Sequence, residues 1–509
     1  MAEAKRASSV SKKGAPAGSR RRSRAAWEHI LGTLDRSNGP LHDQLVRAFV
    51  AAIEAEKVPA GLRVPSGRDL AAMLGIGRNT AMLAISDLVQ RGYMIARSRS
   101  GTYIADRPAR PRVAKDVAQT IGEPDWAARL RLGNMTERES LPISAATRSD
   151  IDFRYGQFDA DLFPVGDWRE CERAALSVME IAHWGRDMID GDDIELIDCM
   201  RKYILPDRGI WASADEIIVT MGGQEGRYLI AQALCRQGAT VGVEYPGMPD
   251  MVKILDRTGA QIRPLELDTE GLVCSPALDG CDVVVTTCGH QCPTTAVMSR
   301  TRRLELLSRA KSEDIVFVED TYDTDLISDD GVPSLYGLDS GQRVIHISSL
   351  SKLIAPGLRI GFVVAPAPVI HHLRELRRLI HRHPPGNNQR ALTIFIQQGF
   401  HRAYLQRVTK ELEARTEALL AALARHLPEF TYRHRSGTAS FWIAAPPQID
   451  TAALAVAAAK LGVFIEPGHH FFSAALPLRN FLRMAVSSVR IRNIEAGIER
   501  LAEAYRSLQ

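Results

Sequence analysis

One lysine, Lys352, is surrounded by residue types that could support covalent chemistry on an amine. It lies in the segment Ser348–Gly361, whose sequence is SSLSKLIAPGLRIG. A lysine amine can form a Schiff base with an aldehyde cofactor. The hydroxyl groups directly before the lysine, together with Arg359 seven residues after it, could bind a phosphate through charge-assisted hydrogen bonds. The spacing therefore predicts a site for an aldehyde cofactor that carries a phosphate.

Three further motifs would place polar groups around such a cofactor. The first, Val318–Asp323, follows an apolar run and carries Asp320, whose carboxylate can pair with a protonated ring nitrogen. The second, Thr220–Gly226, is a glycine turn from a predicted strand into a helix, where backbone N–H groups can hold phosphate. The third, Thr287–Thr294, follows another apolar run and includes His290, which is as readily a scaffold residue as a ring contact.

The elements that must position these motifs alternate along the chain from Ile151 onward. Short β-branched runs are separated by stretches with helical periodicity, and we detect no internal repeat. Strands separated by helices predict a mostly parallel sheet in an α/β domain. The predicted strands are 217–220, 240–243, 282–286, 315–318 and 344–347.

Together the four motifs resemble fold-type-I aminotransferases, which bind pyridoxal 5'-phosphate (PLP). The resemblance implies that Lys352 is the aldimine lysine and that Asp320 pairs with the ring nitrogen. It also implies that Arg483 holds the carboxylate of an effector, unless this arginine is only a structural ion-pair partner. The other residues expected to bind the cofactor are Tyr322 near the ring hydroxyl, Gly223, Gln224, Ser349 and Arg359 at the phosphate, and Ser351 and His290.

Three departures from the aminotransferase pattern make turnover more doubtful than cofactor binding. Met248 stands where the family usually has an aromatic residue beside the cofactor, and it cannot donate a hydrogen bond. Thr295 replaces the usual glycine after Pro-Thr. The Tyr-Gly-Asp-Pro stretch common in the family is replaced by Asp190-Gly191-Asp192-Asp193.

A different pattern occupies residues 40–107. Apolar positions predict a helix over 41–56, and Ser66 is placed to cap a second helix that ends at Gly75. A third helix opens at 79–80 and stops at Gly92. Two short helices joined by a glycine-containing turn indicate a helix-turn-helix, although helical pairs also occur in ordinary cores. The runs 93–96 and 102–105 predict a hairpin with a basic tip, suited to contact DNA as a wing.

This segment resembles the winged-helix domain of GntR-type bacterial regulators. The resemblance rests on Val64-Pro65-Ser66, the run Arg68–Ala71, Arg78-Asn79-Thr80 and Ser100-Gly101-Thr102, among other positions. It implies that double-stranded operator DNA is the partner. The residues expected at the DNA are Ser66, Arg68, Arg78, Asn79, Thr80, Arg97 and Arg99.

Composition sets the organisation of the chain. Its 509 residues are 45% hydrophobic with a net charge of +4, so more than one core is expected and the charge alone proves no nucleic-acid partner. Seven scattered cysteines indicate a reduced, cytoplasmic protein, with no apolar run for a membrane span and no ligand spacing for a metal. The predicted parts are a basic disordered arm (1–38), a winged helix (39–107), a linker with a short helix near 125–132 (108–149) and an aminotransferase-like domain (150–509).

The combination of the two domains resembles the MocR subfamily of GntR regulators, in which the transferase fold senses an effector. The expected function is therefore PLP-dependent transcription regulation in response to an amino compound that forms an aldimine at Lys352. A functional aminotransferase with an accessory DNA-binding domain and a direct sensor of PLP remain as alternatives. The fold usually builds its cofactor site between two subunits, so a homodimer is expected.

Overall fold

The chain folds into two compact units, residues 1–129 and 130–509. The computed structural model describes residues 27–32, 34–35, 39–98, 100–106, 125–129, 150–322, 332–352, 354–435, 438–472 and 478–509. Each unit has a hydrophobic core of its own. None of the helices in these ranges is both long and apolar enough to cross a membrane.

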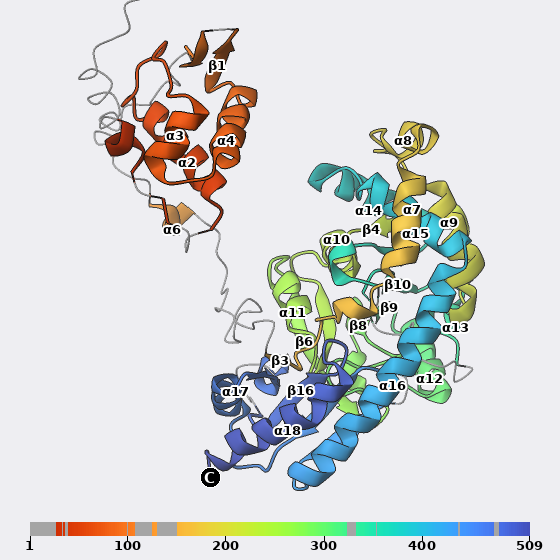
Figure 1. The fold of residues 1–509 in the computed structure, drawn as a ribbon. Helices are drawn as coiled ribbons and strands as arrows, with labels where there is room; N and C mark the ends of the chain where they lie inside the picture. The colour runs from red at the N-terminus through yellow and green to blue at the C-terminus, as the bar shows by residue number, and fades with distance from the viewer. Residues whose placement is uncertain are drawn as a thin grey trace, which may run out of the picture. The chain divides into compact units, whose positions relative to one another are not determined.

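The N-terminal unit is a three-helix domain with a two-stranded hairpin, drawn in red and orange in Figure 1. The Oγ of Ser66 accepts a hydrogen bond from the Asp69 amide at 3.2 Å and so caps the second helix, which ends at Gly75 in the left-handed conformation (φ 66°). These caps confirm the predicted helix-turn-helix. The elements are α2 (Leu41–Glu54), α3 (Gly67–Leu74), α4 (Arg78–Gln90), β1 (Met94–Arg97) and β2 (Gly101–Ile104).

The prediction of a disordered arm through residue 38 is wrong for its described helical segment, 27–31. Trp27 and Leu31 are buried in the core of the N-terminal unit, and the Trp27 ring lies 5.8 Å from that of Phe49 on α2. The apolar residues recur four positions apart on one helical face, and burying them stabilises the segment against the domain. Residues 1–26 and most of the predicted linker lie outside the described residues, apart from the short helix α6 (Trp126–Arg129).

The C-terminal unit is built on an eight-stranded sheet in the order β4-β11-β10-β9-β8-β5-β6-β7. The pairs β10·β9, β9·β8, β8·β5 and β5·β6 are parallel, whereas β11 runs antiparallel to both of its neighbours. All five predicted strands are present in this sheet, which confirms the α/β architecture. The strands are β4 (Ile217–Thr220), β5 (Thr240–Tyr245), β6 (Gln261–Asp268), β7 (Gly271–Leu272), β8 (Val283–Thr286), β9 (Val316–Thr321), β10 (Val344–Ser349) and β11 (Gly361–Val364).

Both faces of this sheet are buried, because successive side chains of one strand enter different apolar clusters. Phe362 and Val364 of β11 lie in the larger cluster, and Val363 between them lies in the smaller one. Helices cover both faces, as parallel sheets require (Figure 1). The helices between β3 and the second sheet are α7 (Val165–Ala175), α8 (Val178–Trp184), α9 (Ile194–Cys199), α10 (Gly223–Leu234), α11 (Pro249–Asp256), α12 (Arg300–Ser312), α13 (Leu335–Asp339), α14 (Ala367–Ile380), α15 (Gly386–Gln397) and α16 (Phe400–His426).

A second, four-stranded antiparallel sheet completes the unit, in the order β12-β13-β16-β15. The long helix α16 packs against α18, as the blue part of Figure 1 shows. A short parallel pair joins the beginning of the unit to this region. The elements are β12 (Thr431–His434), β13 (Ser440–Ala444), α17 (Thr451–Lys460), β15 (Glu466–Pro467), β16 (Phe481–Ala485) and α18 (Ile491–Arg506), with β3 (Ile151–Asp152) paired to β14 (Val463–Phe464).

Candidate functional site

The main sheet brings the predicted motifs together at the carboxyl ends of its parallel strands. Each motif lies at the carboxyl end of a strand or directly after it, and the carboxyl ends of parallel strands meet at the same side of a sheet. Asp320 of β9 is paired in register with Ile347 of β10, so the carboxylate lies one strand away from the segment that leads to Lys352. The glycine turn follows β4, and the His290 loop follows β8.

Lys352 lies between two aromatic rings. Its Nζ is 4.2 Å from the ring centroid of Tyr155 and 4.6 Å from that of Tyr322, and the two rings meet edge to face. A cation above the face of an aromatic ring is held by the ring quadrupole. The predicted partners Lys352 and Tyr322 are therefore neighbours. Tyr155 was missed, because a lone tyrosine about 200 residues upstream carries no local signal.

Asp320 is the carboxylate best placed to meet a cofactor. It is 2% exposed, and its Oδ2 accepts a hydrogen bond from Nε of Arg227 at 2.5 Å. Its Oδ1 is buried and accepts no hydrogen bond from the described residues. Buried carboxylate oxygens are normally paired, so this atom fits a protonated ring nitrogen as its missing donor.

The turn after β4 forms a close cradle for a phosphate. Gly222 has φ 77°, and a Cβ at this position would lie 2.9 Å from Nη2 of Arg359. That Nη2 donates to the carbonyl of Met221 at 2.7 Å, so the guanidinium lies against the turn. The predicted Gly223 is the first residue of α10, where backbone N–H groups favour anions. The predicted Gln224 instead accepts a hydrogen bond from Nη1 of Arg227 at 2.8 Å.

The predicted hydroxyls divide into two kinds. Ser349 is the last residue of β10 and is half-buried at the carboxyl end of that strand. Ser351 is buried, and its Oγ accepts from the Ile360 amide at 3.0 Å and donates to the Ile360 carbonyl at 3.2 Å. Its only donor is used by the backbone, so Ser351 can offer a ligand only an acceptor.

His290 is buried against Tyr322, with the two rings stacked at 5.8 Å. Burial lowers the pKa of His290 to about 3, and the nearby charges of Arg435 and Arg483 act in the same direction. The imidazole is therefore neutral at physiological pH. Its Nδ1 lies 3.4 Å from the Tyr322 hydroxyl, which places the histidine beside the predicted cofactor residue.

Arg483 reaches the same region from the second sheet. Its Nε donates to Oε2 of Glu466 at 2.8 Å, and the two residues are direct cross-strand partners in β16 and β15. Its guanidinium carbon lies 4.2 Å from the Tyr155 ring and 4.8 Å from the Phe471 ring. Burial opposes the charge of Arg483, yet Glu466 raises the pKa above its usual value. One edge of this arginine is thus already paired.

The structure shows the local setting of two of the sequence departures. Met248 is half-buried and packs on the apolar cluster that contains Tyr322, so it contributes packing where it cannot donate a hydrogen bond. Thr295 has φ 62°, the left-handed conformation that favours glycine and is costly for a β-branched residue. Glu244 anchors this loop, accepting hydrogen bonds from Thr287 N and Oγ1 at 3.0 and 2.6 Å and from Gln291 Nε2 at 3.0 Å.

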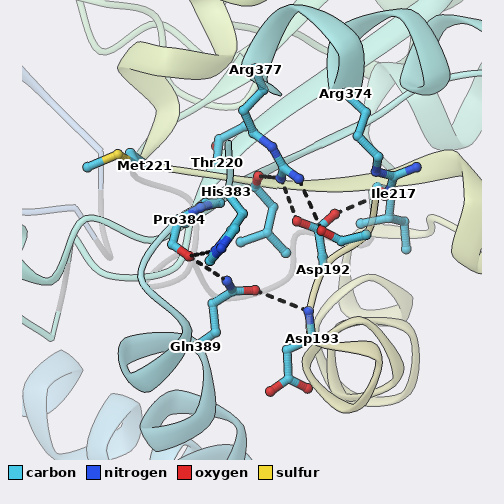
Figure 2. Close-up of polar contacts among 12 residues, drawn as sticks. Asp192, Asp193, Ile217, Thr220, Met221, Arg374, Arg377, His383, Pro384 and Gln389 are labelled. Atoms are coloured by element: carbon cyan, nitrogen blue, oxygen red, sulfur yellow. Dashed lines mark hydrogen bonds and ion pairs between the residues drawn. The ribbon is translucent and has the colours of Figure 1, made fainter. Parts of the chain in front are cut away.

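The third departure, around Asp192, connects β4, which leads into the glycine turn, to helix α14. Figure 2 shows Arg374 and Arg377 converging on Asp192. Arg377 is fully buried, and its Nη1 donates to Asp192 Oδ1 at 2.5 Å and to the Val219 carbonyl at 2.6 Å. The Asp193 amide donates to Gln389 Oε1 at 3.3 Å, and the Asp193 side chain caps α9. Asp192 is therefore connected through Arg377 to β4, whose end carries the phosphate turn, whereas Asp193 connects the start of α9 to α15.

The predicted DNA-contacting residues that the structure describes belong to α3, its N-cap, α4 and β1. Arg68, Arg78 and Asn79 are exposed, and Thr80 is half-buried in the first turn of α4. Arg97 is exposed on β1, with its guanidinium carbon 4.8 Å from the Tyr103 ring. Ser66 serves as the helix cap, and Arg99 lies outside the described residues.

Comparisons with known proteins agree with both halves of this architecture. Residues 41–104 match the family of bacterial regulatory proteins of the gntR type, and residues 156–501 match aminotransferase class I and II. The chain therefore belongs to the GntR-type transcription regulators that carry an aminotransferase-like domain, the MocR architecture.

Two relatives show how far this similarity extends. The HTH-type transcriptional regulator TauR of Rhodobacter capsulatus is 37% identical over 469 residues, which cover 92% of this chain and 97% of TauR. The probable rhizopine catabolism regulatory protein MocR of Rhizobium meliloti is 28% identical over 78% of this chain and 80% of its own. The chain is a DNA-binding transcription regulator of this type.

Among solved structures, a kynurenine aminotransferase of Pyrococcus horikoshii superposes with a TM-score of 0.66 at 24% identity, over 77% of this chain and 98% of the enzyme. An α-aminoadipate aminotransferase of Thermus thermophilus gives 0.65 at 22% identity, over 77% of this chain and 98% of the enzyme. At this identity the likeness establishes the fold, which is that of PLP-dependent aminotransferases.

Proposed function

We propose that this regulator binds PLP at Lys352 and responds to a primary amine that competes for the cofactor. The observation that carries the proposal is the buried Asp320, whose Oδ1 accepts no hydrogen bond from any residue that the structure describes and which lies at the same end of the sheet as Lys352. A buried carboxylate oxygen without a donor is costly unless a ligand supplies one. When bound, PLP supplies an aldehyde that condenses with primary amines and a ring whose protonated nitrogen withdraws electrons.

The chain's own residues then have distinct tasks. The Lys352 amine is the attachment point, and its two aromatic neighbours restrict where it can reach. Arg359 and the turn at Gly222 would hold the phosphate through charge and backbone N–H groups. Neutral His290 buttresses Tyr322, which would contact the ring hydroxyl.

The effector class follows from Arg483. A buried guanidinium is suited to an acid group of the effector, either a carboxylate or a similar anion such as a sulfonate. Because Nε of Arg483 donates to Glu466 and Nη1 donates to Cys292 Sγ at 3.3 Å, an incoming anion would bind at Nη2 or displace one of these two acceptors. Effector contacts of this kind can shift the protein between two arrangements only if they differ between them.

The proposal includes a homodimer. Leu176, Val178 and Met179, around the start of α8, are 59, 86 and 78% exposed. Clustered exposed apolar side chains mark interaction surfaces, and a second copy of the chain is the partner that this fold commonly uses. Two winged helices would then recognise a repeated or palindromic operator. Light scattering on the purified chain measures this state directly.

The test is a visible absorbance spectrum of the purified protein and of Lys352→Ala, followed by titration with amino acids while DNA binding is measured. We expect a cofactor band that is lost in Lys352→Ala and that shifts with an amine together with DNA affinity. Arg483→Leu should weaken binding of an acid-bearing amine by about 10- to 100-fold and leave an amine without an acid group unaffected.

Three outcomes would contradict the proposal. Absence of any cofactor band in the wild type would refute PLP binding. Rapid turnover of an amino donor with a keto acid, at unchanged DNA affinity, would identify an aminotransferase with an accessory DNA-binding domain. A DNA response to PLP with no amine present would identify a direct sensor of the vitamin.

A further inference from the structure

We propose that Met82 and Leu83 read thymine methyl groups in the major groove and so bias the operator toward T·A pairs at defined positions. The two side chains are 51 and 62% exposed, although both are large and apolar. They lie in α4, the second helix of the helix-turn-helix, which enters the major groove in proteins of this type. The inference rests on DNA binding and is independent of the cofactor.

The burial pattern along α4 shows that Met82 and Leu83 are not part of the hydrophobic core of the N-terminal unit. Ala81, Ala84 and Leu88 are fully buried against the rest of the domain. Met82 and Leu83 lie outside this buried face of the same helix, one turn after Arg78 and Asn79, respectively. The exposed face of α4 therefore combines two polar residues at its first turn with two apolar residues at the next.

The side chain of Met82 packs against α3 at Gly67, where the neighbouring helix has no side chain. Gly67 is the first residue of α3 and is buried, and a Cβ added there would overlap the Sδ of Met82. The thioether thus rests in the space that the missing side chain leaves. A side chain with one preferred position loses less entropy when it binds a partner.

The charge around this apolar pair selects nucleic acid as the partner. Arg68, Arg78 and Arg97 are exposed, and within the part of the chain that the structure describes none of them forms an ion pair with a carboxylate. The acidic Asp87 of α4 is instead paired with Arg91, at 2.7 Å. Exposed arginines in the helix-turn-helix and hairpin, with Arg78 one turn before Met82 in α4, complement a phosphate backbone with a methyl-bearing groove between its strands.

Thymine is the base that such a surface can recognise. In the major groove it alone presents a C5 methyl group, which apolar side chains contact. Burying one methyl contributes about 0.8 kcal/mol, which corresponds to about fourfold in affinity. Uracil in place of thymine removes this methyl and leaves the hydrogen-bonding edges unchanged, so it isolates the contact.

The experiment uses the full chain and a DNA duplex that the full chain itself selects from a random library. Each thymine of the selected duplex is replaced by uracil in turn, and affinity is measured for the wild type, Met82→Ala, Leu83→Ala and the double variant. We expect uracil to cost the wild type about fourfold per contacted methyl at one or two positions per half-site, and to cost the double variant nothing at those positions.

Two further variants sharpen the result. Gln90→Ala changes an exposed residue at the last turn of α4 and should leave the discrimination between thymine and uracil intact. Gly67→Ala should displace the flexible end of Met82 and reduce that discrimination at the position read by Met82, with little effect on folding. The dependence of affinity on salt should be the same in Met82→Ala as in the wild type, because no phosphate contact is lost.

The proposal is overturned if uracil costs the wild type nothing, or if the cost persists unchanged in the double variant. It is also overturned if the double variant changes the oligomeric state and leaves base discrimination intact, since the apolar pair would then contact protein. If the full chain selects no duplex from the random library, sequence-specific DNA binding itself is refuted.

Discussion

Arg227→Met removes the cation that accompanies the most deeply placed carboxylate of the candidate site. Arg227 is 9% exposed and Asp320 is 2% exposed, so neither charge is well solvated. In the variant Asp320 loses the donor to Oδ2, and its Oδ1 already accepts no hydrogen bond from the described residues. Methionine fills much of the volume of the arginine stem, so the change acts mainly on charge and hydrogen bonding.

The expected loss follows from this burial. Removing one member of a buried ion pair typically costs about 3–5 kcal/mol, because the remaining charge is left uncompensated. Removing both charges costs much less. The double variant Arg227→Met/Asp320→Asn should therefore be more stable than Arg227→Met alone, although it carries one more substitution.

Urea unfolding of the full chain without added cofactor measures this difference, through the midpoint and slope of the transition of the C-terminal unit. A loss of less than about 1 kcal/mol in Arg227→Met would refute the argument that the pair is buried and coupled. A double variant less stable than the single by the full cost of Asp320→Asn would refute it too, because the two changes would then be additive.

Two further predictions concern the cap of the DNA-binding helix and the buried histidine. Ser66→Ala should destabilise the N-terminal unit by about 1 kcal/mol, since the Asp69 amide loses its acceptor, and Ser66→Thr, which keeps the hydroxyl that also donates to Asp69 Oδ2, should retain most of that stability in thermal melting. His290 stays neutral in the folded chain down to about pH 3, whereas an unfolded histidine takes up a proton near 6.5. The unfolded state thus binds more protons below pH 6.5, so stability falls as the pH falls, by roughly 2 kcal/mol between pH 6.5 and 5. His290→Gln should remove this part of the pH dependence of the free energy of unfolding, as measured by denaturant titrations at several pH values. If the free energy of unfolding falls as steeply with pH in the variant as in the wild type, the prediction is wrong.

Local patterns in the sequence were sufficient to predict much of the molecule. The cap at Ser66 and the glycine at Gly75 are decided by residues within one helical turn, and both occur as predicted. The alternation of β-branched runs with helical periods identified five strands of the main sheet. The spacing around Lys352 pointed to the cofactor site because all of its members lie within a few residues of one another.

Contacts between distant segments were beyond such patterns. Arg227 sits in an ordinary amphipathic helix and reads as a surface residue, yet it pairs with Asp320, 93 residues away. Glu466 faces Arg483 only because β15 and β16 are adjacent in one register. Trp27 was assigned to a disordered arm because the basic residues before it dominate the composition.

The sequence by itself therefore determined the fold class, the two-domain organisation and the lysine that would carry the cofactor. Periodicity, caps and short motifs are properties of residues close together in the chain, so they can be recognised from the sequence alone. Tertiary structure alone decided which charges share a buried site and which apolar side chains stay exposed. Burial and pairing depend on how segments far apart in the chain pack together, and no local pattern encodes that packing.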